Sequence, residues 1–181
     1  KVLQGYVAMH ADMWVTPKFL SIVRANIRSY ISMHVMSAGV PQISDNADIP
    51  THGWWWDREY NATLLAKRKF LARGWAWGLA IGWVDLYYVP RDAWPEFTSA
   101  LRVFEESHVF NEIAVPSAAT MVCGRRSIHM LPLNCLGSCC SQPLPNWPPS
   151  NIAQPMLDST CGHPLRLEKP AHLAALQAAW M

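Results

Sequence analysis

The chain has 181 residues, of which 51% are hydrophobic and 15% are charged, and its formal net charge is +2. This length and composition suit a domain with a buried core and argue against disorder throughout. The small charge is spread along the chain, which argues against a nucleic-acid surface or a polybasic membrane anchor. The sequence contains no run of about 18 apolar residues that would predict a transmembrane segment.

The first predicted element is a strand over residues 2–9. Because the chain begins at Lys1 and not at a methionine, we expect further residues upstream. The segment GYVAMHADMW carries His10 and Asp12 directly after the apolar run. In open α/β sheets ligands bind beyond the carboxyl ends of strands. The two side chains therefore indicate either a site or a strand that has simply reached solvent.

Two helices are predicted next. The segment PKFLSIVRANIRSYISMHV predicts a helix that begins at Pro17, and residues 37–53 predict a polar loop. The segment WWWDREYNATLLAKRKFLARG then predicts a second helix, with Gly74 as its C-cap. The expected apolar side of this helix carries Leu64, Leu65, Phe70 and Leu71.

Residues 83–89, WVDLYYV, are aromatic and β-branched and predict a strand that Pro90 ends. Alternation gives this strand two faces, one with Trp83, Asp85 and Tyr87 and the other with Val84, Leu86 and Tyr88. A carboxylate on a mostly aromatic face is costly unless it is paired. Asp85 is therefore expected either to contact a ligand or to cap a neighbouring turn.

The clearest helical pattern follows that strand, with apolar residues at three- and four-residue steps at Trp94, Phe97, Leu101 and Phe104. The segment FNEIAVPSAATMV predicts a short turn and another helix, in which Glu112 stabilises the helix dipole near its start. The alternation of strands and helices predicts an α/β domain whose sheet is covered by helices.

The composition changes near Cys123. All five cysteines and eight of the 14 prolines lie in the last 59 residues. We therefore predict an α/β domain over residues 1–122 and an irregular Pro- and Cys-rich tail over 123–181, with one helix at 171–180. The tail is interpreted either as a genuine loop-rich segment or as the translation of an intron or a shifted frame. The odd number of cysteines and their spacing predict neither a disulfide framework nor a structural zinc site.

Three segments carry a resemblance to a known family: GYVAMHADMW, GWVDLYYVPRDAWPEF and VFNEIAVPSA. In this order they resemble a poorly characterised group of eukaryotic glycosyltransferase-like proteins of the GT-A, nucleotide-diphospho-sugar transferase type, with exostosin-type enzymes as a distant comparison. The resemblance covers residues 4–122 and implies a partial GT-A-like sheet without the N-terminal nucleotide-binding part. It also implies a place in the secretory pathway, in the Golgi or the ER lumen.

The resemblance implies a role for each acidic position. The sequence HAD stands where a DxD motif is expected, so Asp12 is the implied ligand of Mn²⁺ or Mg²⁺, with His10 as a weaker ligand. Imidazole departs from the oxygen-rich sites that Mg²⁺ prefers. Asp85 is implied to be an acceptor-site acid, and Glu112 the base that removes the proton from the attacking hydroxyl. The implied partners are a nucleotide sugar and a glycan or protein acceptor.

Aromatic residues support a second hypothesis. Tryptophans are frequent between residues 54 and 83, and aromatic rings pack against the C–H faces of sugars as well as in cores. Trp54, Trp83 and Tyr87 are the predicted substrate-binding residues. The chain is thus expected to be a glycosyltransferase, or an inactive fragment of one, or else a noncatalytic aromatic-rich carbohydrate-binding or interaction module. The sequon Asn61-Ala62-Thr63 would permit N-glycosylation in the secretory pathway.

Overall fold

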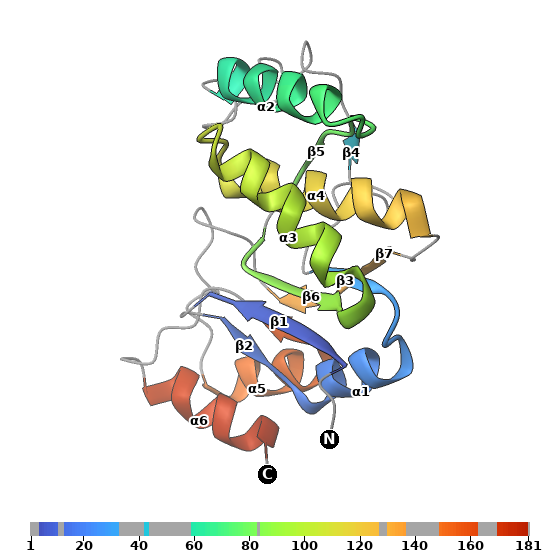
Figure 1. The fold of residues 1–181 in the computed structure, drawn as a ribbon. Coiled ribbons are helices and arrows are strands. Elements are labelled where there is room, and N and C mark those ends of the chain that lie inside the picture. The colour runs from blue at the N-terminus through green and yellow to red at the C-terminus, as the bar shows by residue number, and fades with distance from the viewer. Residues whose placement is uncertain are drawn as a thin grey trace.

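A four-stranded sheet lies at the centre of the computed structural model, which describes residues 4–10, 13–32, 42–43, 59–82, 84–126, 130–136, 149–162 and 170–180. Helices and two smaller sheets surround it, which confirms the predicted mixed α/β class (Figure 1). Among the helices that the structure describes, none combines the length and the apolarity needed to span a bilayer.

The central sheet has the strand order β1-β6-β3-β7. Strand β1 (Gly5–Met9) runs antiparallel to β6 (Leu86–Pro90). Strand β3 (Tyr30–Ser32) is antiparallel to β6 and parallel to β7 (Met130–Pro132). The strand predicted at 2–9 is therefore confirmed over Gly5–Met9, while residues 2–3 lie outside the described ranges. The strand predicted at 83–89 is also confirmed, although it begins at Leu86 and includes Pro90.

Successive residues of β6 enter different cores. Leu86 and Tyr88 pack with Phe19 of helix α1 (Pro17–Ala25) on one face of the sheet. Val89 and the partly buried Tyr87 belong to the other core, which helices α3 (Trp94–Glu105) and α4 (Asn111–Arg126) cover. The predicted alternation is confirmed inside the strand. Val84, predicted to lie with Leu86, packs on the α3 and α4 side instead, because it precedes the regular strand.

Helix α1 is shorter than predicted. It begins at Pro17 as expected but ends at Ala25, where the Asn26 side chain donates a hydrogen bond to the Ile22 carbonyl at 2.9 Å. Of the residues expected to continue the helix, Tyr30–Ser32 form β3 between β6 and β7, and residues 33–35 lie outside the described ranges. All three residues of β3 are buried. Aromatic and β-branched residues favour strands, and pairing on both sides decides against the helix.

Helix α2 (Tyr60–Ala72) ends as predicted, with Gly74 in the left-handed region at a φ of 70°. Its buried face is only partly the predicted one, since Phe70 is buried but Leu65 and Leu71 are 43% and 55% exposed. The other buried positions are Thr63 and Ala66. The prediction is therefore corrected: the buried side of α2 carries Thr63 and Ala66 beside Phe70, and not Leu65 and Leu71, so that small residues approach the core.

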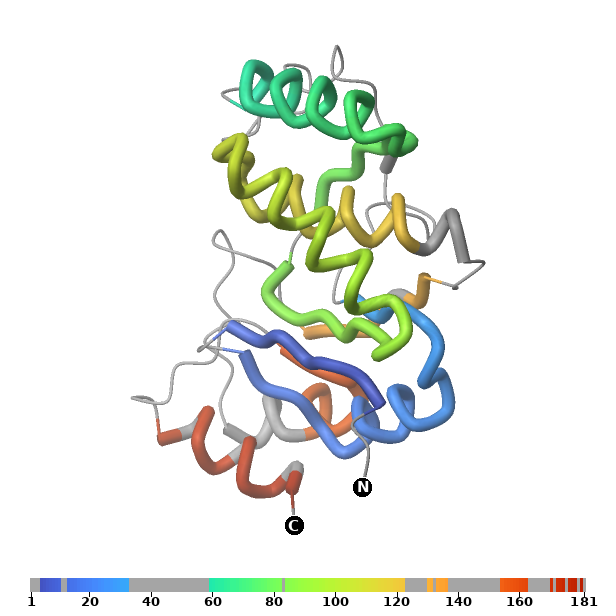
Figure 2. Tube along the Cα trace, in the orientation of Figure 1, coloured from blue at the N-terminus to red at the C-terminus, as the bar shows by residue number. Residues whose placement is uncertain are grey.

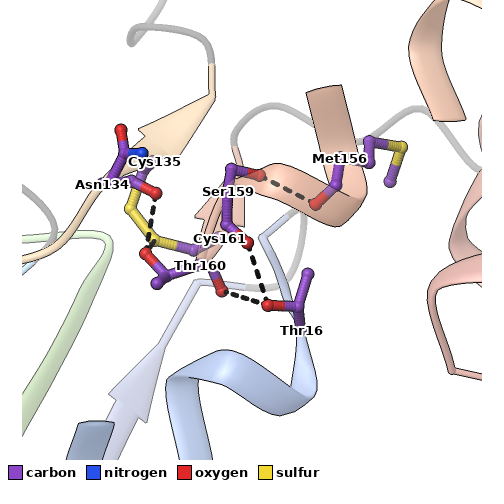
Figure 3. The surroundings of a disulfide bond; sticks show 7 residues. All are labelled: Thr16, Asn134, Cys135, Met156, Ser159, Thr160 and Cys161. Atoms are coloured by element: carbon purple, nitrogen blue, oxygen red, sulfur yellow. Dashed lines mark hydrogen bonds between the residues drawn. A yellow bond between two sulfur atoms is a disulfide. The ribbon is translucent and has the colours of Figure 1, made fainter. Parts of the chain in front are cut away.

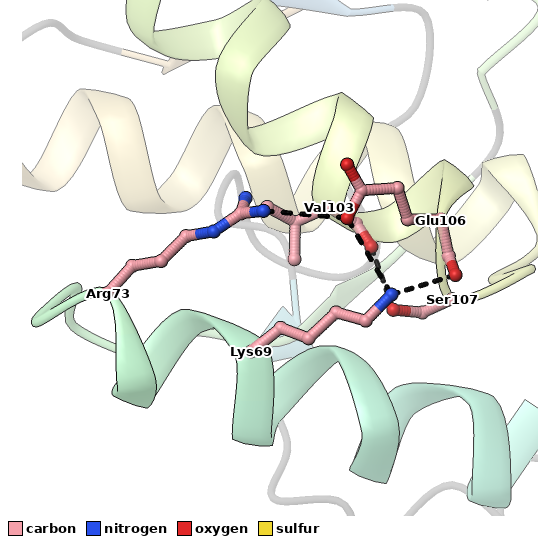
Figure 4. A network of polar contacts seen from close by, with 5 residues as sticks. All are labelled: Lys69, Arg73, Val103, Glu106 and Ser107. Atoms are coloured by element: carbon pink, nitrogen blue, oxygen red, sulfur yellow. Dashed lines mark hydrogen bonds and ion pairs between the residues drawn. The ribbon is translucent and has the colours of Figure 1, made fainter.

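Helices α2 and α3 are also joined at the surface (Figure 4). The Lys69 ammonium donates to the backbone carbonyl of Glu106 at 2.8 Å and lies 3.6 Å from its carboxylate. Arg73 reaches the same carboxylate at 3.4 Å. Because these groups are exposed, each pair contributes only about 0–1 kcal/mol, and the helix contact depends mainly on the aromatic core beneath.

Helix α4 holds the short strand β5 (Ala80–Ile81), which pairs with β4 (Gln42–Ile43). The buried Ser117 hydroxyl accepts a hydrogen bond from Ala80 N–H at 2.8 Å and donates one to the Ala80 carbonyl at 3.0 Å. This two-point contact fixes the strand against the helix.

The segment after residue 123 contributes regular elements, so the expectation of an irregular tail is wrong there. These elements are β7, β8 (Cys135–Leu136), α5 (Pro149–Asp158), β9 (Cys161–Gly162) and α6 (Pro170–Trp180). The last confirms the predicted helix at 171–180. Strand β9 pairs with β2 (Trp14–Val15), so the N- and C-terminal segments lie side by side (Figure 2).

A disulfide joins Cys135 to Cys161, which corrects the expectation that the cysteines form none (Figure 3). The two residues face each other in the parallel register of β8 and β9. Several hydrogen bonds lie around the disulfide, and in one of them the Thr160 hydroxyl donates to the Asn134 carbonyl at 2.7 Å. The Thr16 hydroxyl lies 3.0 Å from the Ser159 carbonyl and ties the same region to the start of α1.

Candidate functional site

Two predicted site residues, His10 and Asp85, meet at one end of the central sheet. The backbone N–H of His10 donates to the Asp85 carbonyl at 2.7 Å, which continues the β1·β6 ladder by one residue. In an antiparallel pair the end of one strand meets the start of the other. The Oδ2 atom of Asp85 is shielded from solvent. His10 thus follows the carboxyl end of β1 as expected, and it pairs with Asp85 because the neighbouring strand β6 is antiparallel.

Glu112 attaches to the same segment. It lies in the first turn of α4, is only 9% exposed, and accepts a hydrogen bond at its carbonyl from Gly82 N–H at 3.0 Å. Gly82 precedes Asp85 by three residues, which span at most about 11 Å even when extended. The helix start and the β6 start are thus held near one another, while the role of the Glu112 carboxylate stays a prediction.

Asp12, Trp54 and Trp83 lie outside the described residues, and their roles stay predictions. Within the described ranges, no three or more His, Cys, Asp or Glu side chains are grouped so that they could hold a metal ion. The remaining predicted residue, Tyr87, packs 6.3 Å from Tyr30 between ring centroids, on the α3 side of the sheet. Burial, and secondly the nearby Tyr6, raise the pKa of Tyr87 above its usual value.

The described surface is hollowed at the opposite end of the β1·β6 ladder. A hollow of about 310 Å³, here called the aromatic hollow, is lined by Gly5, Tyr6, Arg91 and Trp94. The Tyr6 and Trp94 rings lie 4.8 Å apart between centroids and are inclined by 43°. The two side chains are 51% and 37% exposed. An exposed aromatic pair beside a guanidinium in a hollow of this size is an arrangement that can bind a small molecule.

A second hollow adjoins the first. It has a volume of about 280 Å³, is here called the arginine hollow, and is lined by Gln4, Ile27, Arg28, Arg91 and Asp92. Arg91 belongs to both hollows. It follows β6 directly, and its backbone N–H donates to the Gln4 carbonyl at 2.9 Å.

Tyr88 supports the backbone of two residues that line the arginine hollow, Gln4 and Ile27. Its hydroxyl lies 3.1 Å from the Gln4 carbonyl and 3.0 Å from the Ile27 carbonyl, so the start of β1 is tied to the turn after α1. Gly5 allows this, because a Cβ at that position would overlap the Tyr88 ring. Burial, and secondly the Asp92 carboxylate, raise the pKa of Tyr88.

Sequence reasoning missed the pair formed by Tyr6 and Trp94. The three- and four-residue pattern places Trp94 on the apolar side of its helix, and its ring does lie 6.2 Å from that of Phe97. As the first residue of α3, however, it reaches past the edge of the core. The signal that was available is the position of a large aromatic residue at a helix start, directly after Arg91 and Asp92.

Comparison of the chain with protein-family models, with curated proteins and with solved structures gives no match.

Proposed function

We propose that the chain binds a carbohydrate, with a sugar ring stacked in the aromatic hollow. The observation that carries the proposal is the exposed pair of Tyr6 and Trp94 beside Arg91 in a hollow of about 310 Å³. This volume is at the lower end of the range of roughly 300–1,000 Å³ for small-molecule sites. A binding module of this kind was the alternative hypothesis from the sequence, with other aromatic residues.

The chemistry of the lining suits a sugar better than a purely apolar ligand. Aromatic rings cover the C–H face of a pyranose, and Tyr also offers a hydroxyl. A guanidinium carries five N–H donors, which match the hydroxyl and ring oxygens at the edge of the same sugar. In the aromatic hollow these two kinds of group stand together on the first turn of α3, the preceding residues and β1.

The test is isothermal titration calorimetry of the full chain with a panel of neutral and acidic mono- and oligosaccharides. Trp94→Ala is expected to weaken binding by about tenfold or more, which corresponds to about 1.4 kcal/mol. Trp180→Ala is the matched control, because Trp180 is 50% exposed and lies on α6. Unchanged affinity in Trp94→Ala, or no binding of any sugar, would contradict the proposal.

Glycosyl transfer is the second candidate function, favoured by the juxtaposition of His10, Asp85 and the start of α4. In this proposal the GT-A likeness assigns Asp12 and His10 to a divalent metal, Mn²⁺ or Mg²⁺. The metal would neutralise the diphosphate of a nucleotide sugar. Asp85 would lie at the acceptor and Glu112 would take its proton, while Trp54, Trp83 and Tyr87 would contact the substrates. A His and carboxylate donor set suits Mn²⁺ better than Mg²⁺.

A thermal-shift titration with Mn²⁺ and UDP tests the second candidate. A ligand that binds only the native state at 100 times its Kd stabilises by about 2.7 kcal/mol. Stabilisation that needs both additives and vanishes in Asp12→Ala is the expected result. Asp158→Ala, an exposed carboxylate on α5, is the control and should behave as the wild type. A cooperative melt without any shift would oppose transfer and leave sugar binding untouched.

We also propose a place in the secretory pathway, as the family likeness implied. The Cys135–Cys161 disulfide supports it, because structural disulfides persist mainly in oxidising compartments.

A further inference from the structure

We infer that the bound carbohydrate is acidic and that its carboxylate or sulfate group lies in the arginine hollow, between Arg28 and Arg91. This inference rests on the proposed sugar binding at the aromatic hollow and names the class of sugar.

The two hollows are placed so that one ligand can occupy both. Arg91 lines each of them, and the adjacent residues Gln4 and Gly5 line one each. A ring stacked on Tyr6 and Trp94 therefore has Arg91 at its edge and the arginine hollow beyond. A substituent of the ring that reaches past Arg91 therefore enters the hollow that Arg28 also lines.

The charges in the arginine hollow favour a single anionic group. Both arginines are exposed, and neither forms an ion pair with another residue of the described ranges. Guanidinium groups bind carboxylate and sulfate oxygens through two parallel N–H donors. Asp92 also lines the hollow, so the described residues of the lining carry a net charge of about +1. A polyanion such as a nucleic acid would be repelled by the Asp92 carboxylate, whereas a single acidic group can lie between the two arginines.

The backbone around the hollow is held in place without a ligand. The Tyr88 hydroxyl contacts the carbonyls of Gln4 and Ile27, and Arg91 N–H donates to Gln4. Arg28 directly follows Ile27, so the two guanidinium groups project from backbone positions that are fixed relative to one another. Preorganisation of this kind lowers the cost of binding.

The experiment compares acidic sugars with neutral ones of the same shape by calorimetry. Trigalacturonic acid and its trimethyl ester test the carboxylate, and galactose 6-sulfate and galactose test the sulfate. The wild type is expected to bind at least one acidic probe about tenfold more tightly than its neutral counterpart. Raising the salt concentration from 0.05 to 0.3 M should reduce this preference, because exposed charges are screened.

Three variants locate the acidic group. Arg28→Met is expected to abolish the preference, and Arg28→Lys to keep part of it, because the lysine retains the charge but not the fork. Arg24→Met is the matched control, since it removes another exposed arginine, on α1 and outside the residues that line the two hollows. It should bind as the wild type does.

The outcomes separate the inference from the function on which it rests. Equal affinities for acidic and neutral probes, with binding still lost in Trp94→Ala, would overturn the acidic-sugar inference and leave the proposed function standing. An unchanged preference in Arg28→Met would overturn the placement at Arg28. Binding of none of the four probes, nor of any sugar of the wider panel, would overturn both.

Discussion

The carbonyl of Glu112, in the first turn of α4, accepts a hydrogen bond at 3.0 Å from the N–H of Gly82, which directly follows β5. Pro116 explains this contact. It lies inside α4 and has no N–H, so the carbonyl four residues before it lacks its helical donor. Gly82 supplies that donor from outside the helix. A sequence feature that ordinarily disfavours a helix thus becomes the attachment point for the segment that leads to Asp85 and β6.

Ser117 is predicted to be the energetically important hydroxyl of α4. Ser117→Ala removes the partner of both Ala80 N–H and the Ala80 carbonyl in a buried place, and each unmade hydrogen bond costs about 1–3 kcal/mol. Chemical denaturation should show a loss of stability in that range or above. Ser99→Ala is the control, because the exposed Ser99 hydroxyl only donates back to Pro95. Equal small losses in both variants would contradict the role of Ser117.

The Cys135–Cys161 disulfide is predicted to contribute a large part of the stability. It closes a loop of 26 residues in sequence separation, for which chain-entropy estimates give about 3–4 kcal/mol. Reduction, or the double variant Cys135→Ser/Cys161→Ser, should therefore lower the free energy of unfolding by about this amount in guanidinium titrations. Added reductant should not lower the stability of the double variant further. A wild type whose unfolding is indifferent to reductant would contradict the prediction.

Gly5 is predicted to be intolerant of any side chain. In Gly5→Ala the new Cβ overlaps the Tyr88 ring, so the ring or the start of β1 has to move, at a cost of about 1–3 kcal/mol. The same movement should weaken sugar binding, because Gly5 lines the aromatic hollow. At Gly78 an added Cβ meets the flexible side chain of Met121 at 3.3 Å. Gly78→Ala should therefore cost less and leave binding unchanged, and the reverse order would refute the proposed support by Tyr88.

Stability is predicted to fall at alkaline pH. Burial raises the pKa of Tyr87 and of Tyr88 above the ordinary value of 10.0, with further contributions from Tyr6 and Asp92 respectively. The unfolded chain then releases these protons at a lower pH than the folded chain. The stabilising contribution is complete below about pH 10 and is lost as the pH rises through the folded-state pKa values.

Urea unfolding between pH 8 and pH 11 measures this effect. Tyr88→Phe should flatten the alkaline decline relative to the wild type, at the expense of some stability at pH 8 from the lost contacts to Gln4 and Ile27. Identical slopes in the two proteins above pH 10 would show that Tyr88 does not contribute.

Local patterns in the sequence predicted those elements that depend on neighbours along the chain. The helix starts at Pro17 and near Trp94, the left-handed Gly74 and the helix at the C-terminal end are all confirmed. Each depends on capping, on glycine conformation or on a three- and four-residue period. The alternating burial within β6 is likewise a property of one strand, and the sequence was sufficient to predict it.

Only the tertiary structure decided which segments meet. Pairing with β6 and β7 made residues 30–32 a strand, and the β8·β9 register brought Cys135 to Cys161. The antiparallel β1·β6 register placed His10 beside Asp85 at one end and Gly5 beside Pro90 at the other, where Tyr6 reaches Trp94. Such contacts join residues that are tens of positions apart. Burial and hydrogen bonding over the whole chain decide which residues pair, and a local periodicity in the sequence does not indicate the partner.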